Sequence, residues 1–290
     1  MTGILYALVP MLAWGSIGFI SNKIGGTPNQ QTFGLTLGAV VFASVVYMIV
    51  RPELTVMTWL YGIIGGMLWA VGQNGQFSAM QYMGVSVANP LSSGSQLVIG
   101  SLIGVLAFQE WTKPIQFILG TIALIFLLVG FYFSSKQDKD KSASQDSQPR
   151  DFKKGFQALT TSTLGYVSYT VFFNNIVNLD PMSAILPMSF GMVLGAAMFM
   201  KFQVNFEPVV LKNSIVGIMW GFGNIFMLLA AAEAGLAIAF SFSQLGAIIS
   251  IIGGIVILGE KKTKKEMVWV LLGVSCFIIG AVLLGIVKSY

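Results

Sequence analysis

Apolar stretches long enough to cross a lipid bilayer recur along this whole chain, about every 25–30 residues. A helix of about 20 apolar residues crosses a hydrocarbon layer about 30 Å thick. The expected spans are 2–21, 31–50, 57–79, 86–108, 114–133, 155–174, 182–200, 212–232, 236–258 and 266–287. These runs are too uniformly apolar for the alternating strands of a membrane barrel, whereas a helix satisfies its backbone groups internally. The sequence therefore predicts an all-α integral membrane protein with ten transmembrane helices.

The composition excludes several classes of function. Charged residues make up 9% of the 290 residues, against about 25% in a typical soluble domain, so we expect neither a soluble enzyme nor a nucleic-acid binder. Histidine is absent and Cys276 is the only cysteine, which removes histidine bases, zinc clusters and disulfide frameworks. We therefore expect no catalytic residue, no metal and no cofactor. A membrane-embedded enzyme or sensor is the disfavoured alternative.

Residues 134–154 are charged, rich in serine and glutamine and almost free of apolar side chains, as is typical of a linker. They separate two halves, 1–133 and 155–290, with five expected spans each. The halves match weakly and in one order: Trp14-Gly15-Ser16 with Tyr166-Val167-Ser168, Gly66 to Trp69 with Gly217 to Trp220, Gly84 to Ala88 with Gly235 to Ala239, and Glu110 with Glu260. An odd number of spans gives the halves opposite orientations. The pattern predicts one transporter domain, 1–290, built from two inverted five-helix repeats with the substrate between them.

The basic residues predict which side each loop faces. The loops after the odd-numbered spans carry 13 of the 16 lysines and arginines. Cytoplasmic loops of membrane proteins are enriched in these two residues. We therefore expect the linker 134–154 and the loop 259–265 in the cytoplasm, and both termini outside.

Three stretches resemble a known family: Pro10 to Ser16 (PMLAWGS), Gly72 to Gln76 (GQNGQ) and Val87 to Gln96 (VANPLSSGSQ). With the paired halves and the GEKKT sequence at 259–263, they resemble the drug/metabolite transporter superfamily and, within it, the bacterial glucose/ribose uptake porters. The resemblance implies uptake of a monosaccharide across the bacterial cytoplasmic membrane by alternating access coupled to protons. It favours glucose as the substrate, with ribose as the alternative. Many ten-span members of this superfamily have both termini inside, contrary to the charge distribution here.

Sugar recognition requires groups that donate and accept hydrogen bonds, and a flat apolar surface for the ring. A fixed charge would add a desolvation cost without benefit to a neutral hexose. The spans provide amides and indoles at helical spacing, as in Trp69, Gln73 and Gln76. The predicted substrate-binding residues are Trp14, Trp69, Gln73, Asn74, Gln96, Tyr166, Trp220, Asn224 and Gln244. The alternative for each amide is an interhelical hydrogen bond worth about 0.5–2 kcal/mol.

Five pairs of glycines spaced four residues apart predict surfaces where helices approach closely. The pairs lie at positions 34/38, 62/66, 100/104, 191/195 and 217/221. Because glycine has no side chain, the backbone of a neighbouring helix can come near, which favours helix association in lipid.

Proton coupling requires a group that titrates within the transport path, and no aspartate or glutamate falls in the middle of an expected span. Glu233, at the end of span 212–232, is the proton-coupling candidate because it has no basic neighbour in sequence to keep it ionised. Glu110 and Glu260 are followed closely by lysines and are expected to form helix-end charge pairs or turn clamps. A facilitator without coupling, or an exporter of a lipophilic drug or metabolite, are the alternatives. The sequence leaves the oligomeric state open.

Overall fold

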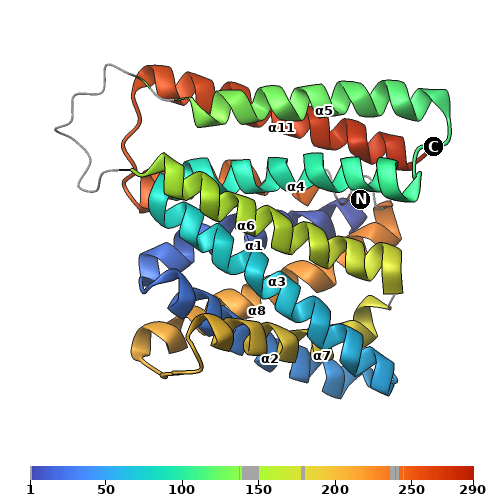
Figure 1. Cartoon of the computed structure of the whole chain (residues 1–290), viewed down its shortest axis with the longest axis vertical. Coiled ribbons are helices and arrows are strands. Elements are labelled where there is room, and N and C mark those ends of the chain that lie inside the picture. The colour runs from blue at the N-terminus through green and yellow to red at the C-terminus, as the bar shows by residue number, and fades with distance from the viewer. Residues whose placement is uncertain are drawn as a thin grey trace.

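The computed structural model describes residues 2–136, 138, 150–177, 180–235, 239, 242–243 and 245–290. All regular elements in these ranges are helices (Figure 1). The α-helices are α1 (Thr2–Ile24), α2 (Pro28–Val50), α3 (Val56–Met83), α4 (Val85–Phe108), α5 (Pro114–Ser135), α6 (Phe152–Val171), α7 (Pro181–Phe199), α8 (Pro208–Ala234), α10 (Gly246–Ile252) and α11 (Lys264–Lys288). Two π-helical segments, η1 (Phe172–Val177) and η2 (Gly253–Ile257), extend α6 and α10. The predicted all-α architecture is confirmed.

Eight of these helices are long and apolar enough to cross a membrane, which makes the chain a multi-pass membrane protein. The other two expected spans, 155–174 and 236–258, correspond to α6 with η1 and to the region of α10 with η2. The first of these is more polar, since α6 carries the run TTST at 160–163. The second contains an apolar helical stretch, Gly246–Ile257, that is shorter than a full span. Ten spans therefore stay a prediction.

Local sequence signals explain where the helices begin and end. The hydroxyls of Thr27 and Thr55 accept hydrogen bonds from the N–H groups of Gln30 and Thr58, so capping boxes start α2 and α3. A single residue, Gly84, separates α3 from α4, and its φ of +85° is one that side-chain-bearing residues rarely adopt. Because of this one-residue turn, the start of α4 lies directly beside the end of α3.

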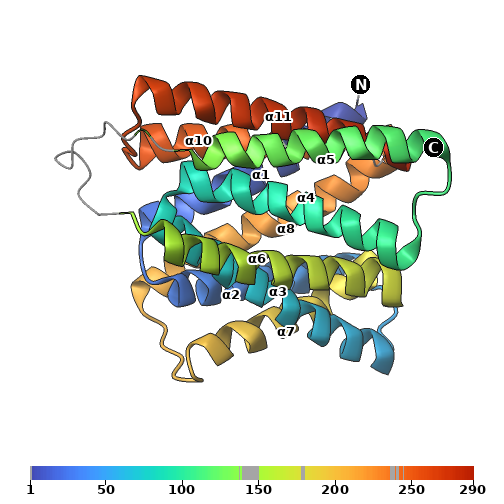
Figure 2. The same cartoon turned by 45° about the horizontal axis from the view of Figure 1, so that its top comes forward.

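The helices lie side by side, and both chain termini lie at the same side of the bundle (Figure 1). We call that side the terminal end, and the opposite side, where α5 ends and α6 begins, the linker end. Figure 1 and Figure 2 both place α5 beside α11 along one edge of the bundle and α7 along the opposite edge. Helices α3 and α8 lie between these edges, so the centre of the bundle is formed by residues from both halves of the chain.

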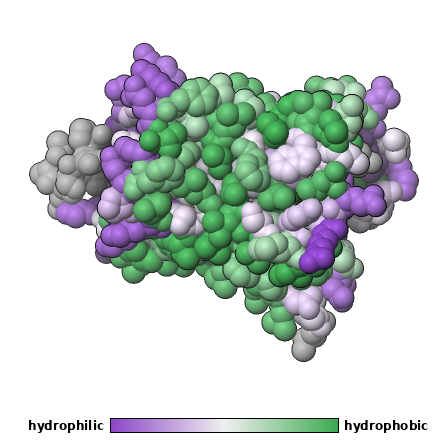
Figure 3. All heavy atoms as spheres, turned by 90° about the horizontal axis from the view of Figure 1, so that it is seen from below, coloured by the Kyte–Doolittle hydropathy of each residue, from purple (hydrophilic) through white to green (hydrophobic). Residues whose placement is uncertain are grey.

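The polarity of the surface differs between the middle of the molecule and its two ends. Figure 3 shows apolar residues across the middle of the molecule and hydrophilic residues gathered at its two ends. Exposed large apolar side chains include Ile64 and Leu106, and exposed charges include Lys154 and Lys265 at helix starts. An apolar middle between two polar ends is the arrangement that a bilayer imposes.

Two helices at the centre of the bundle, α3 and α8, each pack against two helices of the other half. Helix α3 packs against α6 and α7, and α8 packs against α1 and α2. Further pairs are α5 with α11, α2 with α7, and α4 with α10.

Glycines allow these contacts to be close. A Cβ atom on Gly66 would lie 2.1 Å from the carbonyl oxygen of Met188, and one on Gly217 would lie 1.9 Å from that of Leu35. The close packing predicted for the pairs at 34/38, 62/66, 191/195 and 217/221 is confirmed. The pair at 100/104 differs: no described atom lies within 4 Å of a Cβ on Gly100, and Gly104 faces the carboxylate of Glu110 rather than a neighbouring helix.

Candidate binding site

The centre of the bundle contains two buried tryptophans, one from each half. The rings of Trp69 on α3 and Trp220 on α8 meet at a centroid distance of 5.4 Å and an angle of 62°. The ring of Tyr166 on α6 lies 5.9 Å from that of Trp69, at 76°. Such edge-to-face contacts are a favourable geometry for aromatic rings. All three predicted site residues are buried, and the structure brings them together.

The hydroxyl of Tyr166 begins a chain of hydrogen bonds among amides. It donates to Oε1 of Gln73 at 2.7 Å, with Oε1 of Gln76 a second acceptor at 3.1 Å. Nε2 of Gln73 donates to Oε1 of Gln76 at 3.5 Å, and Nε2 of Gln76 donates to Oδ1 of Asn89 on α4 at 2.9 Å. We call Tyr166, Gln73, Gln76 and Asn89 the amide chain. Its members are buried, so each hydrogen bond replaces a lost interaction with water.

Aromatic rings cover equivalent glycines on α3 and α8. A Cβ on Gly72 would lie 2.6 Å from the ring of Tyr166, and one on Gly223 would lie 2.2 Å from Nε1 of Trp14. Nε1 of Trp14 donates to the carbonyl oxygen of Trp220 at 3.4 Å. The predicted residue Trp14 therefore lies beside the tryptophan pair and is half-buried.

Two further predicted amides, Gln96 and Asn224, are half-buried. Nε2 of Gln96 donates to the hydroxyl of Ser92 at 3.0 Å, and that hydroxyl lies 3.3 Å from the hydroxyl of Ser162 on α6. Nδ2 of Asn224 donates to the carbonyl oxygen of Trp220, one turn earlier in α8, at 2.8 Å. Each of these amides uses its nitrogen in a local bond, and within the described part of the chain neither oxygen accepts a hydrogen bond.

Other predicted residues lie away from this cluster or outside the described part of the chain. Nδ2 of Asn74 donates to Oδ1 of Asn29 at 2.8 Å and is 3.4 Å from the hydroxyl of Thr32, so Asn74 faces α2. The side chain of Glu233 is exposed at the terminal end of α8. Gln244 lies outside the described residues.

Some polar contacts involve residues that the sequence did not single out. Asn89 lies next to Gln76 across the turn at Gly84, and no spacing in the sequence predicted this contact. Oδ1 of Asn213, a fully buried residue of α8, accepts a hydrogen bond from the hydroxyl of Ser21 at 2.6 Å. No local sequence signal pairs residues 192 positions apart.

The cluster carries no ionisable acid or base other than the phenol of Tyr166, and the charges lie near the helix ends. One example is Asp151 at the start of α6, where the backbone N–H of Lys154 lowers the pKa of the carboxyl group. Among the described residues, no group of three cysteines, aspartates or glutamates is placed to hold a metal ion. The arrangement can therefore recognise a neutral polar molecule through hydrogen bonds and ring contacts.

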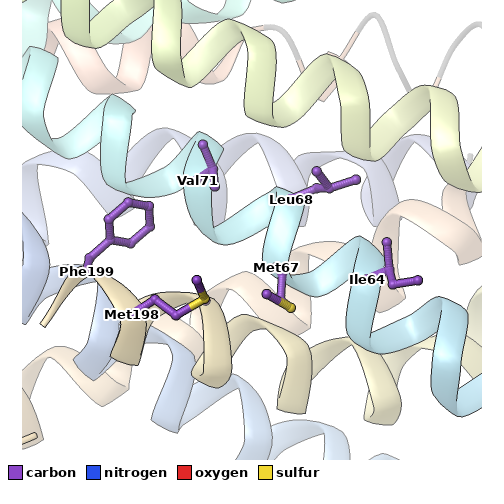
Figure 4. Close-up of a pocket in the computed structure, with 7 residues that line it drawn as sticks. Ile64, Met67, Leu68, Val71, Met198 and Phe199 are labelled. Atoms are coloured by element: carbon purple, nitrogen blue, oxygen red, sulfur yellow. The ribbon is translucent and has the colours of Figure 1, made fainter. Parts of the chain in front are cut away.

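A hollow of about 560 Å³ lies elsewhere, between α3 and α7 (Figure 4). It is lined by Ile64, Met67, Leu68, Val71, Gly195, Met198 and Phe199. These side chains offer no hydrogen-bond donor, and the thioether sulfurs of Met67 and Met198 are only weak acceptors for the hydroxyls of a polar ligand. We therefore assign the candidate site to the tryptophan pair and the amide chain, where polar and aromatic groups converge.

The fold defines a multi-pass membrane protein, and an uncharged cluster of buried amides and aromatic rings lies at its centre. The model of the family described as sugar transport protein matches residues 5–287, and the chain belongs to this family. It is 67% identical over 290 residues to a protein of Streptococcus agalactiae, with both chains covered completely. It is 60% identical over 295 residues to a protein of Lactococcus lactis, covering 100% of this chain and 99% of that one. Both relatives are named for sugar uptake.

A solved structure described only as a crystal structure of a protein has the same fold. The superposition covers 96% of this chain and 96% of that one, with a TM-score of 0.57 and 14% sequence identity. At this identity the likeness concerns the arrangement of the helices alone.

Proposed function

We propose that the chain takes up a monosaccharide across the bacterial cytoplasmic membrane by alternating access. Glucose is the proposed substrate, and ribose is the alternative. Membership of the sugar transport family and the names of its relatives support sugar as the substrate class. The observation that carries the proposal is the buried amide chain beside the paired rings of Trp69 and Trp220. Amides and indoles match the hydroxyls and the apolar face of a neutral sugar, and no fixed charge has to be desolvated.

The packing supports two inverted halves that rock about this site. Exchanging the halves maps the contacts of α3 with α6 and α7 onto those of α8 with α1 and α2. It also maps the pairs α5–α11 and α2–α7 onto themselves. The covered glycines, Gly72 under Tyr166 and Gly223 under Trp14, are exchanged in the same way. Inverted repeats of this kind place the substrate near the midplane and open to the two sides in turn.

Transport into membrane vesicles tests the substrate class. Labelled glucose is expected to enter most rapidly, labelled ribose more slowly, and a labelled lipophilic cation no faster than into vesicles without the protein. Unlabelled glucose is expected to compete with both sugars. Uptake of the cation with no uptake of either sugar would instead support the export of a lipophilic compound.

Coupling to protons is part of the proposal, with Glu233 as the proton-binding residue. In the proposed orientation its exposed carboxyl group faces the outside, because the linker end lies in the cytoplasm. A protonophore is expected to abolish accumulation of glucose above the external concentration while leaving exchange of labelled for unlabelled glucose intact. The variant Glu233→Gln is expected to behave in the same way. Accumulation that is insensitive to both treatments would identify a facilitator or another coupling residue.

The orientation of the termini has its own test. A cysteine introduced at Ser289, in a Cys276→Ser background, is expected to react with a membrane-impermeant maleimide in whole cells. A reaction that requires cell lysis would place the termini inside, as in many ten-span members of the superfamily.

A further inference from the structure

The carboxylate of Glu260 joins the two halves of the chain at the linker end. One carboxylate oxygen accepts a hydrogen bond from the backbone N–H of Val85 at 2.6 Å. The other accepts from the N–H of Ser86 at 3.2 Å and from the hydroxyl of the same serine. Val85 and Ser86 are the first residues of α4, where helical N–H groups lack partners within the helix and favour a negative charge. Glu260 belongs to the second half, whereas α4 belongs to the first.

Two glycines lie close against the carboxylate of Glu260. A Cβ on Gly84 would lie 2.9 Å from a carboxylate oxygen of Glu260, and a Cβ on Gly254 would lie 3.1 Å from the other. Gly84 also has the φ of +85° that allows α4 to start next to α3. Both ends of the contact are thus built around glycines, which hold the carboxylate against the start of α4.

The same loop geometry occurs at Glu110, the repeat partner of Glu260. The N–H of Glu260 donates to the carbonyl oxygen of Gly254 at 3.0 Å, and the N–H of Glu110 donates to that of Gly104 at 3.1 Å. Both glycines lie against the carboxylate of their own glutamate. Glu110 lies at the terminal end. The two halves therefore present equivalent glutamates at opposite ends of the bundle.

Helix α4 is packed differently at its two ends. Residues 85–92 at the linker end are all buried, whereas residues 95–103 toward the terminal end are half-buried or exposed. The residues held by Glu260 are thus the beginning of the buried part. Opening the linker end by moving α4 requires the hydrogen bonds to Glu260 to break.

We propose that Glu260 is a positioning residue for transport, whose carboxylate holds the linker end closed by binding the start of α4. Glu110 is its counterpart for the terminal end. This inference rests on the proposed alternating access. Loss of the Glu260 contact favours the state that is open at the linker end. By the symmetry of the repeats, removal of the Glu110 carboxylate favours the opposite state.

The test measures access to the buried part of α4 from the linker side. Ala88 is fully buried two residues after Ser86, and a cysteine is small enough to replace it. The protein carries Ala88→Cys in a Cys276→Ser background, and a membrane-impermeant maleimide is applied from the linker side of vesicles. Glu260→Gln is expected to raise the labelling rate about tenfold, because the amide N–H₂ opposes the helix N–H donors and the charge is lost.

Three variants make the result specific to this contact. Ser86→Ala removes the hydroxyl donor but keeps both backbone donors, so about a threefold rise is expected. Glu110→Gln is expected to lower the labelling rate. Glu266→Gln is the matched control: it removes another carboxylate at the linker end, which caps α11 rather than α4, and it should leave the rate unchanged.

Each outcome decides something. Unchanged labelling in both Glu260→Gln and Ser86→Ala, with unaltered melting temperatures, overturns the proposal. An equal rise in Glu266→Gln shows general loosening and overturns it as well. If Glu260→Gln does not fold, the direction seen in Ser86→Ala and Glu110→Gln decides. Labelling that follows the expected pattern in a protein that moves no sugar would retain the role of Glu260 and reject the proposed substrate.

Discussion

Helices α3 and α8 occupy equivalent places in the two halves but differ in their polar side chains. Both pack through glycines against two helices of the other half, and both bring a tryptophan to the centre. Where α3 has Gln73 and Gln76, α8 has Asn224 and Met227 at the matching positions. Gln73 and Gln76 join α3 to α6 and α4, whereas the amide nitrogen of Asn224 bonds to its own helix.

This difference distinguishes two roles of α3 and α8, namely packing between the halves and hydrogen bonding at the candidate site. The packing of α3 and α8 is similar, as the proposed rocking movement requires, while the buried amides are concentrated on α3. We infer that the first half contributes most of the hydrogen bonds that shape the site. The predictions below test the shared packing first and the unequal chemistry afterwards.

The largest effect is expected where the helices are most alike. Gly66→Val and Gly217→Val both place side-chain atoms against a backbone carbonyl oxygen. Overpacking of this kind costs about 3 kcal/mol, because the backbone of a neighbouring helix moves little. Thermal unfolding of the purified protein in detergent is the measurement. Ile64→Val and Ile215→Val, on exposed faces of the same two helices, are controls expected to melt like the parent. Tolerance of only one glycine substitution would show that the packing is not shared.

The next effect concerns the matched pair Gln73 and Asn224. Gln73→Ala leaves the buried hydroxyl of Tyr166 without its nearest acceptor, which costs about 1–3 kcal/mol, so glucose uptake should fall about 10- to 100-fold. Asn224→Ala removes an amide that donates to a carbonyl oxygen of its own helix, so it does not separate two helices, and about a tenfold loss is expected. Initial uptake rates, corrected for the amount of protein in the membrane, test both. A larger loss in Asn224→Ala would assign the main contacts to α8, and normal uptake in both would make these amides interhelical bonds only.

Exchanging the next matched pair sharpens the comparison. Gln76→Met gives α3 the side chain that α8 carries at Met227, and it removes the hydrogen bond to Asn89. About a tenfold loss of glucose uptake is expected, since the buried amide of Asn89 loses its partner. Met227→Gln is the reciprocal change at a half-buried position and should stay within about threefold of the parent. Equal losses in the two variants would contradict the unequal roles of the helices.

The smallest effect is expected from the two rings that cover glycines. Tyr166→Phe keeps the ring over Gly72 but removes the hydroxyl, so the apparent affinity for glucose should fall about fivefold. Trp14→Phe removes a long hydrogen bond to Trp220 and part of the ring that covers Gly223, and about a twofold change is expected. Competition of unlabelled glucose against a labelled tracer measures both. A stronger effect at Trp14 would show that the ring packed on α8 matters more than the ring packed on α3.

Much of the fold could be predicted because a membrane demands long apolar helices. The run lengths predicted the eight spanning helices to within a few residues. Trp69 and Trp220 were both among the predicted site residues, and the structure brings them together. The spacing of Gln73 and Gln76 by three residues correctly predicted that they share a face.

Side-chain direction was harder to predict, because neighbouring residues on a helix point about 100° apart. Gln73 and Asn74 are adjacent amides, so only one of them can face Tyr166, and the sequence alone does not say which. The contact of Glu260 with α4 was predicted only as a turn clamp or a charge pair. Its partners are backbone N–H groups about 175 positions away, and backbone donors leave no trace in the amino-acid pattern.

The contact between Trp69 and Trp220 gives the protein an intrinsic optical reporter. Indole emission depends on neighbouring aromatic groups and on the polarity around the ring, and in the proposed alternating access these two indoles belong to halves that shift relative to each other. Adding a ligand to unlabelled protein should therefore change the emission spectrum, and Trp220→Phe should reduce that change. Occupancy could then be followed by fluorescence in detergent, where no membrane gradient exists.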